Sequence, residues 1–140
     1  MSIARLSPQF SVSSQLGVED LAGLAASGFR AIVNNRPDGE ESDQPASAAL
    51  AAEAQRLGLA YAHIPIVQAQ IDDAQVRALA RFLAGVDGPA LGFCRTGTRS
   101  ARLWSLAQAG RRPVDEILET AARAGYDLSS LRSRLGDSAA

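Results

Sequence analysis

A lone cysteine, Cys94, opens the segment of this chain whose residue types are best suited to covalent chemistry. The segment 94–100 reads Cys-Arg-Thr-Gly-Thr-Arg-Ser, with two arginines, one glycine and three hydroxyl residues. A short apolar run precedes it and a helical pattern follows it, which predicts a turn from a strand into a helix. Backbone N–H groups in such a turn form a concave site for an oxyanion, and the helix N-terminus adds positive partial charge.

These surroundings make Cys94 the predicted nucleophile, although a lone cysteine can also be a buried, inert thiol. Positive charge and N–H donors favour the thiolate, which is the reactive form of cysteine. Arg99 can donate two parallel hydrogen bonds to an anion, and Gly97 permits backbone geometry that a side chain would obstruct. We therefore predict Cys94 and Arg99 as catalytic residues. The predicted substrate-binding residues are Arg95, Thr96, Gly97, Thr98 and Ser100.

The elements that must position this segment follow from short apolar runs that alternate with amphipathic stretches. Strands are predicted at 9–13, 30–34, 60–67 and 90–93, and helices at 18–27, 46–57, after Asp72, from about 99 to 110, from 113, and at 128–135, with a frayed tail from Gly136. This alternation predicts an α/β fold with a central, mostly parallel sheet flanked by helices. Sites in such sheets form beyond the carboxyl ends of the strands. Three loops are expected there: 35–38, 68–72 and 94–99.

Composition narrows the class of protein. A chain of 140 residues fits one domain, 1–140, and a net charge of −1 without basic clusters argues against nucleic-acid binding. The apolar stretches are too short to span a membrane, and residues 1–10 do not resemble a secretory signal. One cysteine and one histidine predict no disulfide, no metal site and no cofactor. We expect a cytoplasmic protein, while its oligomeric state stays open.

Three motifs in this sequence resemble one known family. They are Asn-Asn-Arg-Pro-Asp-Gly-Glu at 34–40, His-Ile-Pro-Ile at 63–66, and the segment 94–100. The chain resembles the phosphatase-like domain of beta-lactamase-hydrolase-like proteins over residues 7–126. That resemblance implies a protein-tyrosine-phosphatase-like fold of the dual-specificity type, which periodicity alone does not specify.

Two features depart from the phosphatase pattern. Phosphatases of this fold place five residues between the cysteine and the arginine, whereas four intervene here. This shorter loop is similar to the loops of rhodanese-type sulfurtransferases. By the same resemblance, Gln68 occupies the position of the aspartate that protonates the leaving group, and glutamine cannot donate a proton in that way.

Other residues could line the rim or supply the acid. Asp38 and Asp72 are candidate acids, with turn formation and helix capping as their alternative roles. Arg36 is a further candidate for the rim. Glu40, Glu41 and Asp43 are expected to form a solvated rim, and His63 is expected to be structural.

The predicted function is a sulfurtransferase that carries sulfur on Cys94. The expected partners are a small anionic sulfur donor, thiosulfate or a persulfide, and a thiol or cyanide acceptor. The alternative is a protein-tyrosine or dual-specificity-type phosphatase that acts through a Cys94 phosphocysteine. Two further alternatives are arsenate reduction, which would need a partner thiol, and a non-catalytic anion-binding module.

Overall fold

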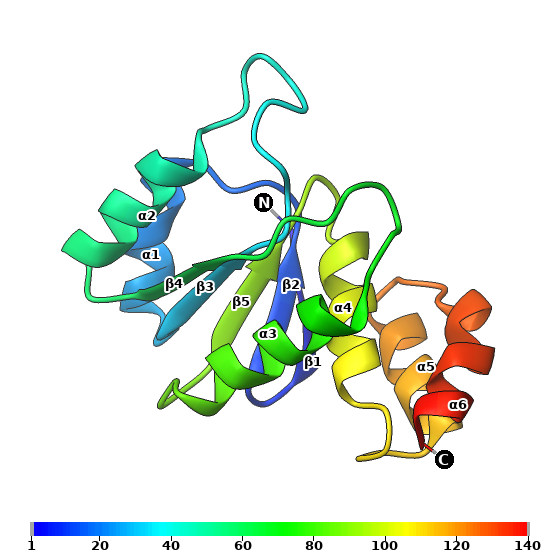
Figure 1. The fold of residues 1–140 in the computed structure, drawn as a ribbon. Coiled ribbons are helices and arrows are strands. Elements are labelled where there is room, and N and C mark those ends of the chain that lie inside the picture. Colours follow the sequence, from blue (N-terminus) through cyan, green and yellow to red (C-terminus); the bar gives the residue numbers. More distant parts are fainter. Residues whose placement is uncertain (1, 140) are drawn as a thin grey trace.

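A five-stranded sheet forms the centre of the computed structural model, which describes residues 2–139 (Figure 1). The strands are β1 (Ile3–Ser7), β2 (Phe10–Ser13), β3 (Ala31–Asn34), β4 (Ala60–His63) and β5 (Ala90–Phe93). Their order is β1-β2-β5-β3-β4, and only β1 runs antiparallel to its neighbour. The prediction of a mostly parallel sheet is therefore confirmed.

Helices cover both faces of the sheet. They are α1 (Leu21–Ala26), α2 (Ser47–Arg56), α3 (Asp73–Ala84), α4 (Thr98–Ala107), α5 (Val114–Arg123) and α6 (Arg132–Ala139). In Figure 1, α1 and α2 lie on one face and α3 and α4 on the other, with α5 and α6 outside α4. Two apolar cores result, one on each face. Because helices cover both faces, all four residues of β3 and of β5 are buried.

Two strands differ from the sequence prediction. β1 (Ile3–Ser7) was not predicted, because only Leu6 of this edge strand is buried and the apolar signal is correspondingly weak. The predicted strand 60–67 ends at His63. Pro65 lies just beyond that end and has no N–H group to donate to a neighbouring strand.

The boundaries of two helices test the predicted start and stop signals. Asp72 Oδ1 accepts the Gln75 amide at 2.8 Å, and Gln75 Oε1 accepts the Asp72 amide at 2.8 Å. This reciprocal pair confirms the predicted capping of α3. By contrast, α6 continues to Ala139, so residues 136–139 are helical where the sequence predicted a frayed tail; the last residue of that tail, Ala140, lies outside the described residues.

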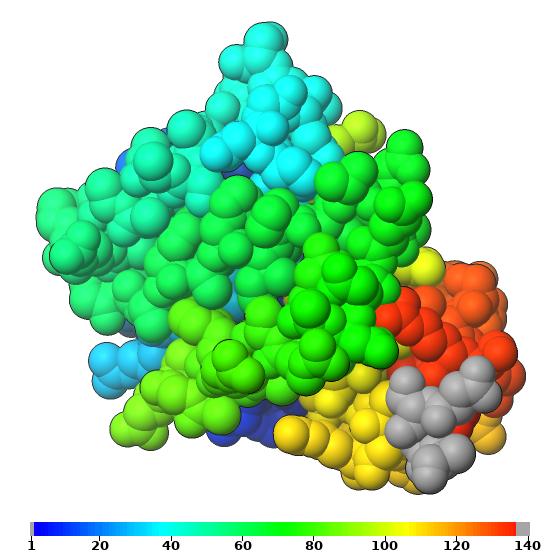
Figure 2. All heavy atoms as spheres, in the orientation of Figure 1, coloured from blue at the N-terminus to red at the C-terminus, as the bar shows by residue number. Residues whose placement is uncertain are grey.

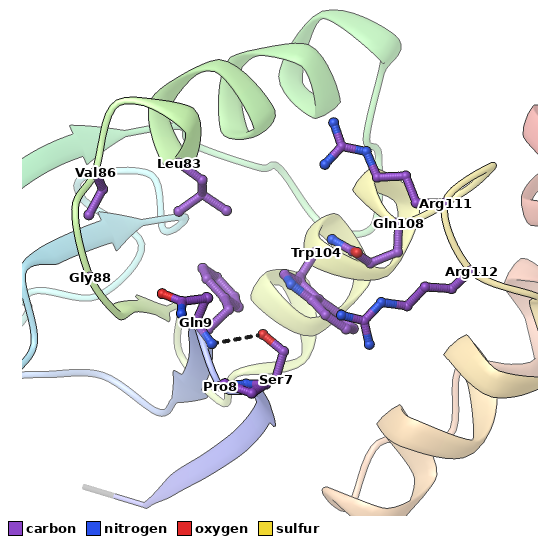
Figure 3. A pocket seen from close by; sticks show the side chains of 11 residues that line it. Ser7, Pro8, Gln9, Leu83, Val86, Gly88, Trp104, Gln108, Arg111 and Arg112 are labelled. Carbon is purple, nitrogen blue, oxygen red and sulfur yellow. Dashed lines mark hydrogen bonds between the residues drawn. The ribbon is translucent and has the colours of Figure 1, made fainter.

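Two surface features lie near opposite ends of the sheet, a projecting segment and a cavity. The segment between β3 and α2 projects at the upper edge of the view in Figure 2. A cavity of about 480 Å³ lies at the opposite end of α4, beside Trp104, Arg111 and Arg112 (Figure 3). Within residues 2–139, no helix is long and apolar enough to cross a membrane.

Candidate active site

Cys94 directly follows β5 and is fully buried. The Gly97 amide donates a hydrogen bond to its Sγ atom at 3.1 Å, so the loop wraps around the sulfur. The next residue after Gly97 begins α4, and the sulfur is therefore close to the N-terminus of that helix. A strand, a turn whose N–H groups form a concave site, and a helix start are the arrangement predicted from the sequence. Such an arrangement favours an anion at the sulfur.

Gly97 adopts a left-handed conformation, with a φ of +92°. A Cβ at this position would lie 2.3 Å from the Tyr126 hydroxyl and 3.3 Å from the Ser13 carbonyl oxygen. Both the backbone angle and the lack of space therefore require glycine here.

We expect Gly97→Ala to destabilise the protein by about 1–3 kcal/mol and to lower the turnover of Cys94, because the loop must shift away from Tyr126. Urea unfolding and activity measurements test this. Gly28→Ala is the matched control, since Gly28 has a φ of +102° but open space around it. It should lose stability without losing activity. Equal losses of activity in both variants would contradict a specific role for Gly97.

A buried hydrogen bond fixes the start of α4 to the neighbouring strand. Ser100 Oγ donates to Asn35 Oδ1 at 2.8 Å, and Asn35 Nδ2 donates to the Ile64 carbonyl at 2.9 Å. The Asn35 amide also donates to the Phe93 carbonyl at 2.8 Å. Asn35 thus connects the loops that follow β3, β4 and β5, and Ser100 acts on the position of the loop rather than on its exposed surface.

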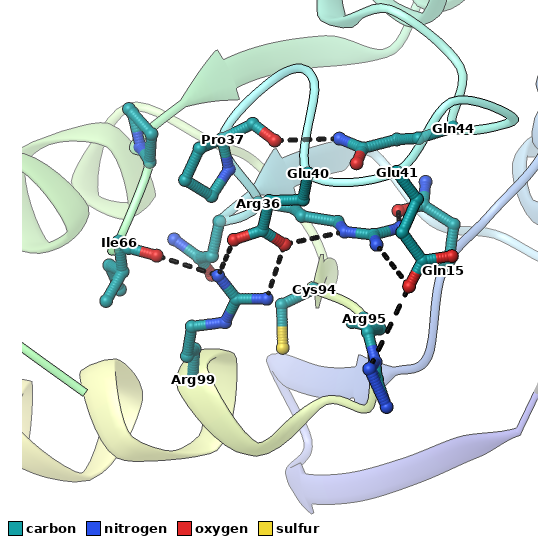
Figure 4. Close-up of polar contacts among 12 residues, drawn as sticks. Gln15, Arg36, Pro37, Glu40, Glu41, Gln44, Ile66, Cys94, Arg95 and Arg99 are labelled. Atoms are coloured by element: carbon teal, nitrogen blue, oxygen red, sulfur yellow. Dashed lines mark hydrogen bonds and ion pairs between the residues drawn. The ribbon is translucent and has the colours of Figure 1, made fainter. Parts of the chain in front are cut away.

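Arg99 is held by two groups from distant parts of the chain (Figure 4). Its Nη1 donates to Glu40 Oε2 at 2.7 Å and to the Ile66 carbonyl at 2.8 Å, and its Nη2 donates to Glu40 Oε1 at 2.9 Å. A guanidinium has five N–H donors, so Nε and one hydrogen of Nη2 are left for another acceptor. In Figure 4 the edge of the guanidinium that carries these free N–H groups is turned towards the Cys94 sulfur. The edge is therefore well placed to bind an anion there.

Electrostatics keep this pair ionised. The hydrogen bond from Arg99 lowers the pKa of Glu40 to about 2, against the opposing effect of burial, and Arg36 acts in the same direction as Arg99. The bond from Glu40 raises the pKa of Arg99, and the nearby charge of Cys94 contributes to the same rise. Glu40 is consequently a carboxylate at neutral pH. Glu40 does more than line a solvated rim, because its side chain is 28% exposed and binds two arginines.

Arg36 lies at the centre of these contacts, with only 4% of its side chain exposed. Its Nε donates to Glu40 at 2.8 Å, its Nη1 donates to Gln15 Oε1 at 2.9 Å, and its Nη2 lies 3.3 Å from Glu41. Glu41 also lies 3.8 Å from Nη1 of Arg95, whose side chain is 61% exposed. Arg36 is therefore an internal support of the site rather than part of an open rim.

The candidate acids have contacts elsewhere. Asp38 Oδ1 accepts the Ser47 amide at 2.8 Å, at the start of α2, and Asp72 caps α3. Gln68 is exposed and has a positive φ of 55°. None of these three is brought to the sulfur by a contact of the described residues, whereas Glu40 reaches the site through Arg99.

The remaining predicted residues lie at the outer surface of the loop. Thr96 and Thr98 are exposed, and their hydroxyl groups lie 3.1 Å apart.

His63 Nε2 forms a 2.9 Å hydrogen bond with the Arg36 carbonyl, which fits the predicted structural role.

Sequence reasoning missed three residues of the site. Gln15 holds Arg36 and donates its amide to the Arg95 carbonyl, Glu40 holds Arg99, and Tyr126 donates to the Thr96 carbonyl at 3.3 Å. Burial, followed by the charge of Cys94, raises the pKa of Tyr126. Of these three residues, only Glu40 could have been found from the sequence, since it is the last residue of the motif at 34–40. Within residues 2–139, no group of three His, Cys, Asp or Glu side chains could hold a metal ion.

The parallel sheet, the cysteine loop and the helix that follows it together define a protein-tyrosine-phosphatase-like fold. A kinase-associated phosphatase, with its catalytic cysteine replaced by serine, shares this fold at a TM-score of 0.73 and 16% identity, over 97% of this chain and 91% of that one. A candidate phosphatase from Neisseria meningitidis superposes with a TM-score of 0.85 and 34% identity, over 99% of both chains.

The sequence pattern of the phosphatase-like domain of beta-lactamase hydrolase-like proteins matches residues 2–111, and the chain belongs to this family. A beta-lactamase hydrolase-like protein of Xylella fastidiosa strain Temecula1 is 35% identical over 130 residues, covering 91% of this chain. The chain spans only 30% of that relative's length. The family predicted from the three motifs is thereby confirmed.

Proposed function

We propose that this domain is a Cys94-dependent sulfurtransferase. The observation that carries the proposal is that Asp38 and Asp72, the candidate acids, each accept a backbone amide at a helix start. The carboxylate that does reach the site, Glu40, has a pKa of about 2 and holds no proton at neutral pH. A reaction whose leaving group departs as a stable anion is therefore favoured over one that needs a strong proton donor.

Sulfur transfer meets this requirement. The Cys94 thiolate attacks the outer sulfur of thiosulfate, the S–S bond breaks, and sulfite leaves with the bonding electron pair. Cys94 is left as a persulfide anion. Cyanide or a thiolate acceptor then takes the outer sulfur and restores the thiolate, so neither step consumes a proton. The free edge of Arg99 and the loop amides hold the donor anion next to the sulfur.

Phosphate ester hydrolysis is the second candidate, and the comparisons favour it. The family is described as phosphatase-like, and the Neisseria protein is a candidate phosphatase. In that reaction Cys94 would attack phosphorus, and the ester oxygen would leave as an alkoxide or phenoxide. Without an acid to protonate it, only esters with very stable leaving groups would react at an appreciable rate.

A paired assay separates the two functions. Purified wild-type protein and Cys94→Ser are each incubated with thiosulfate and cyanide, and in parallel with an aryl phosphate, and the intact protein mass is recorded after each donor alone. We expect thiocyanate formation and a protein heavier by one sulfur atom. Phosphate release that depends on Cys94, together with no gain of sulfur, would show that the domain is a phosphatase.

A further inference from the structure

A continuous chain of ion pairs crosses the candidate site from one side of the cysteine loop to the other (Figure 4). Both arginines of the loop pair with a glutamate of the segment after β3, and both glutamates pair with one buried arginine. In order, the members are Arg95, Glu41, Arg36, Glu40 and Arg99, with N–O separations of 3.8, 3.3, 2.8 and 2.7 Å. We call this set the ion-pair chain.

The ion-pair chain carries a formal charge of +1. Three guanidinium groups and two carboxylates leave one net positive charge beside Cys94. A Cys94 thiolate carries one negative charge, and so does a Cys94 persulfide. The site is therefore balanced both before and after it accepts a sulfur atom.

A dianionic donor departs further from this balance than a monoanionic one. A phosphocysteine carries about two negative charges, and a bound thiosulfate or phosphate ester adds two charges to a thiolate that is already compensated. The two glutamates of the ion-pair chain would repel a dianion about twice as strongly as a monoanion at the same position.

We propose that the ion-pair chain makes Cys94 selective for monoanionic persulfides over dianionic oxyanions. This inference rests on the proposed sulfurtransferase function and specifies its donor. The Cys94 thiolate attacks the outer sulfur of an alkyl persulfide anion, the S–S bond breaks, and an alkyl thiolate leaves. Two negative charges are present before and after the step, and no proton or redox partner is needed. Wild-type protein should accordingly use cysteine persulfide more efficiently than thiosulfate.

Glu41→Gln tests the charge without disturbing the anchor of Arg99. Glu41 is 51% exposed, and the Arg99 guanidinium is anchored by Glu40 and the Ile66 carbonyl rather than by Glu41. The substitution raises the net charge of the ion-pair chain by one unit. Because the attraction scales with ligand charge, we expect kcat/KM to rise about threefold for cysteine persulfide and about tenfold for thiosulfate at low salt. Equal changes for the two donors would overturn the proposal.

Glu119→Gln is the matched control, because Glu119 on α5 is 62% exposed, pairs with Arg123 and lies outside the ion-pair chain. It should change neither value by more than about twofold. A similar rise in this control would show that overall charge, rather than the ion-pair chain, selects the donor.

Anion binding tests the selectivity without any turnover. Calorimetric titration with sulfate and with nitrate compares a dianion and a monoanion in the wild type and in Glu41→Gln. We expect the substitution to tighten sulfate binding about three times more than nitrate binding. An unchanged ratio of the two affinities would refute charge selection, whereas a changed ratio in a protein that transfers no sulfur would refute only the proposed function.

Discussion

Cys94→Ser should abolish sulfur transfer, with a fall of at least about 10⁴-fold in kcat. A serine hydroxyl is not ionised at neutral pH, and it cannot hold a sulfur atom as a persulfide. The variant should fold normally, because serine fits the volume of cysteine and its oxygen can accept the Gly97 amide. Mass spectrometry after incubation with the donor should show no added sulfur.

The same variant also shows whether the loop binds anions independently of the thiol. We expect Cys94→Ser to keep its melting temperature and to bind sulfate, since the loop amides and Arg99 remain. Sulfur transfer that persists in this variant would eliminate Cys94 as the carrier. A loss of sulfate binding together with a much lower melting temperature would instead assign Cys94 a structural role.

Arg99→Lys should lower kcat/KM about 100-fold or more. Lysine keeps the positive charge but lacks the planar set of N–H groups that binds Glu40, the Ile66 carbonyl and an anion at once. A single ammonium group cannot satisfy these acceptors in the same geometry. Steady-state kinetics with a persulfide and with thiosulfate measure the loss.

Arg95→Lys is the matched control for this change in the same loop. Arg95 is 61% exposed and lies 3.8 Å from Glu41, so only its charge contributes to the site. We expect its kcat/KM to stay within about threefold of the wild type. If both variants lost activity equally, the planar set of N–H groups of Arg99 would not be the feature that binds the substrate.

Local patterns in the sequence were sufficient to predict much of the fold. The strand that ends at Phe93, the glycine at 97 and the helix that follows depend on neighbours within a few residues, so periodicity and glycine chemistry identify them. The capping box at Asp72 is local for the same reason. β1 was missed because an edge strand buries too little apolar surface to produce a clear pattern.

The supports of the candidate site could not be predicted in this way. Glu40 and Arg99 are separated by 59 positions, and their contact depends on the path of the loop after β3. From the sequence, Asp38 is a candidate acid and Glu40 a rim residue. In the structure, Asp38 accepts the first amide of α2 and Glu40 is the partner of Arg99.

The sequence by itself determined the candidate nucleophile, the loop around it and the mostly parallel sheet that presents them, because these features arise from local geometry and the periodicity of apolar residues. Only the tertiary structure decided which charges surround the sulfur. Ion pairs between distant segments depend on how the loops at the carboxyl ends of β3, β4 and β5 converge. That convergence also buries Arg36 and keeps Glu40 ionised, and so it sets the net charge around Cys94.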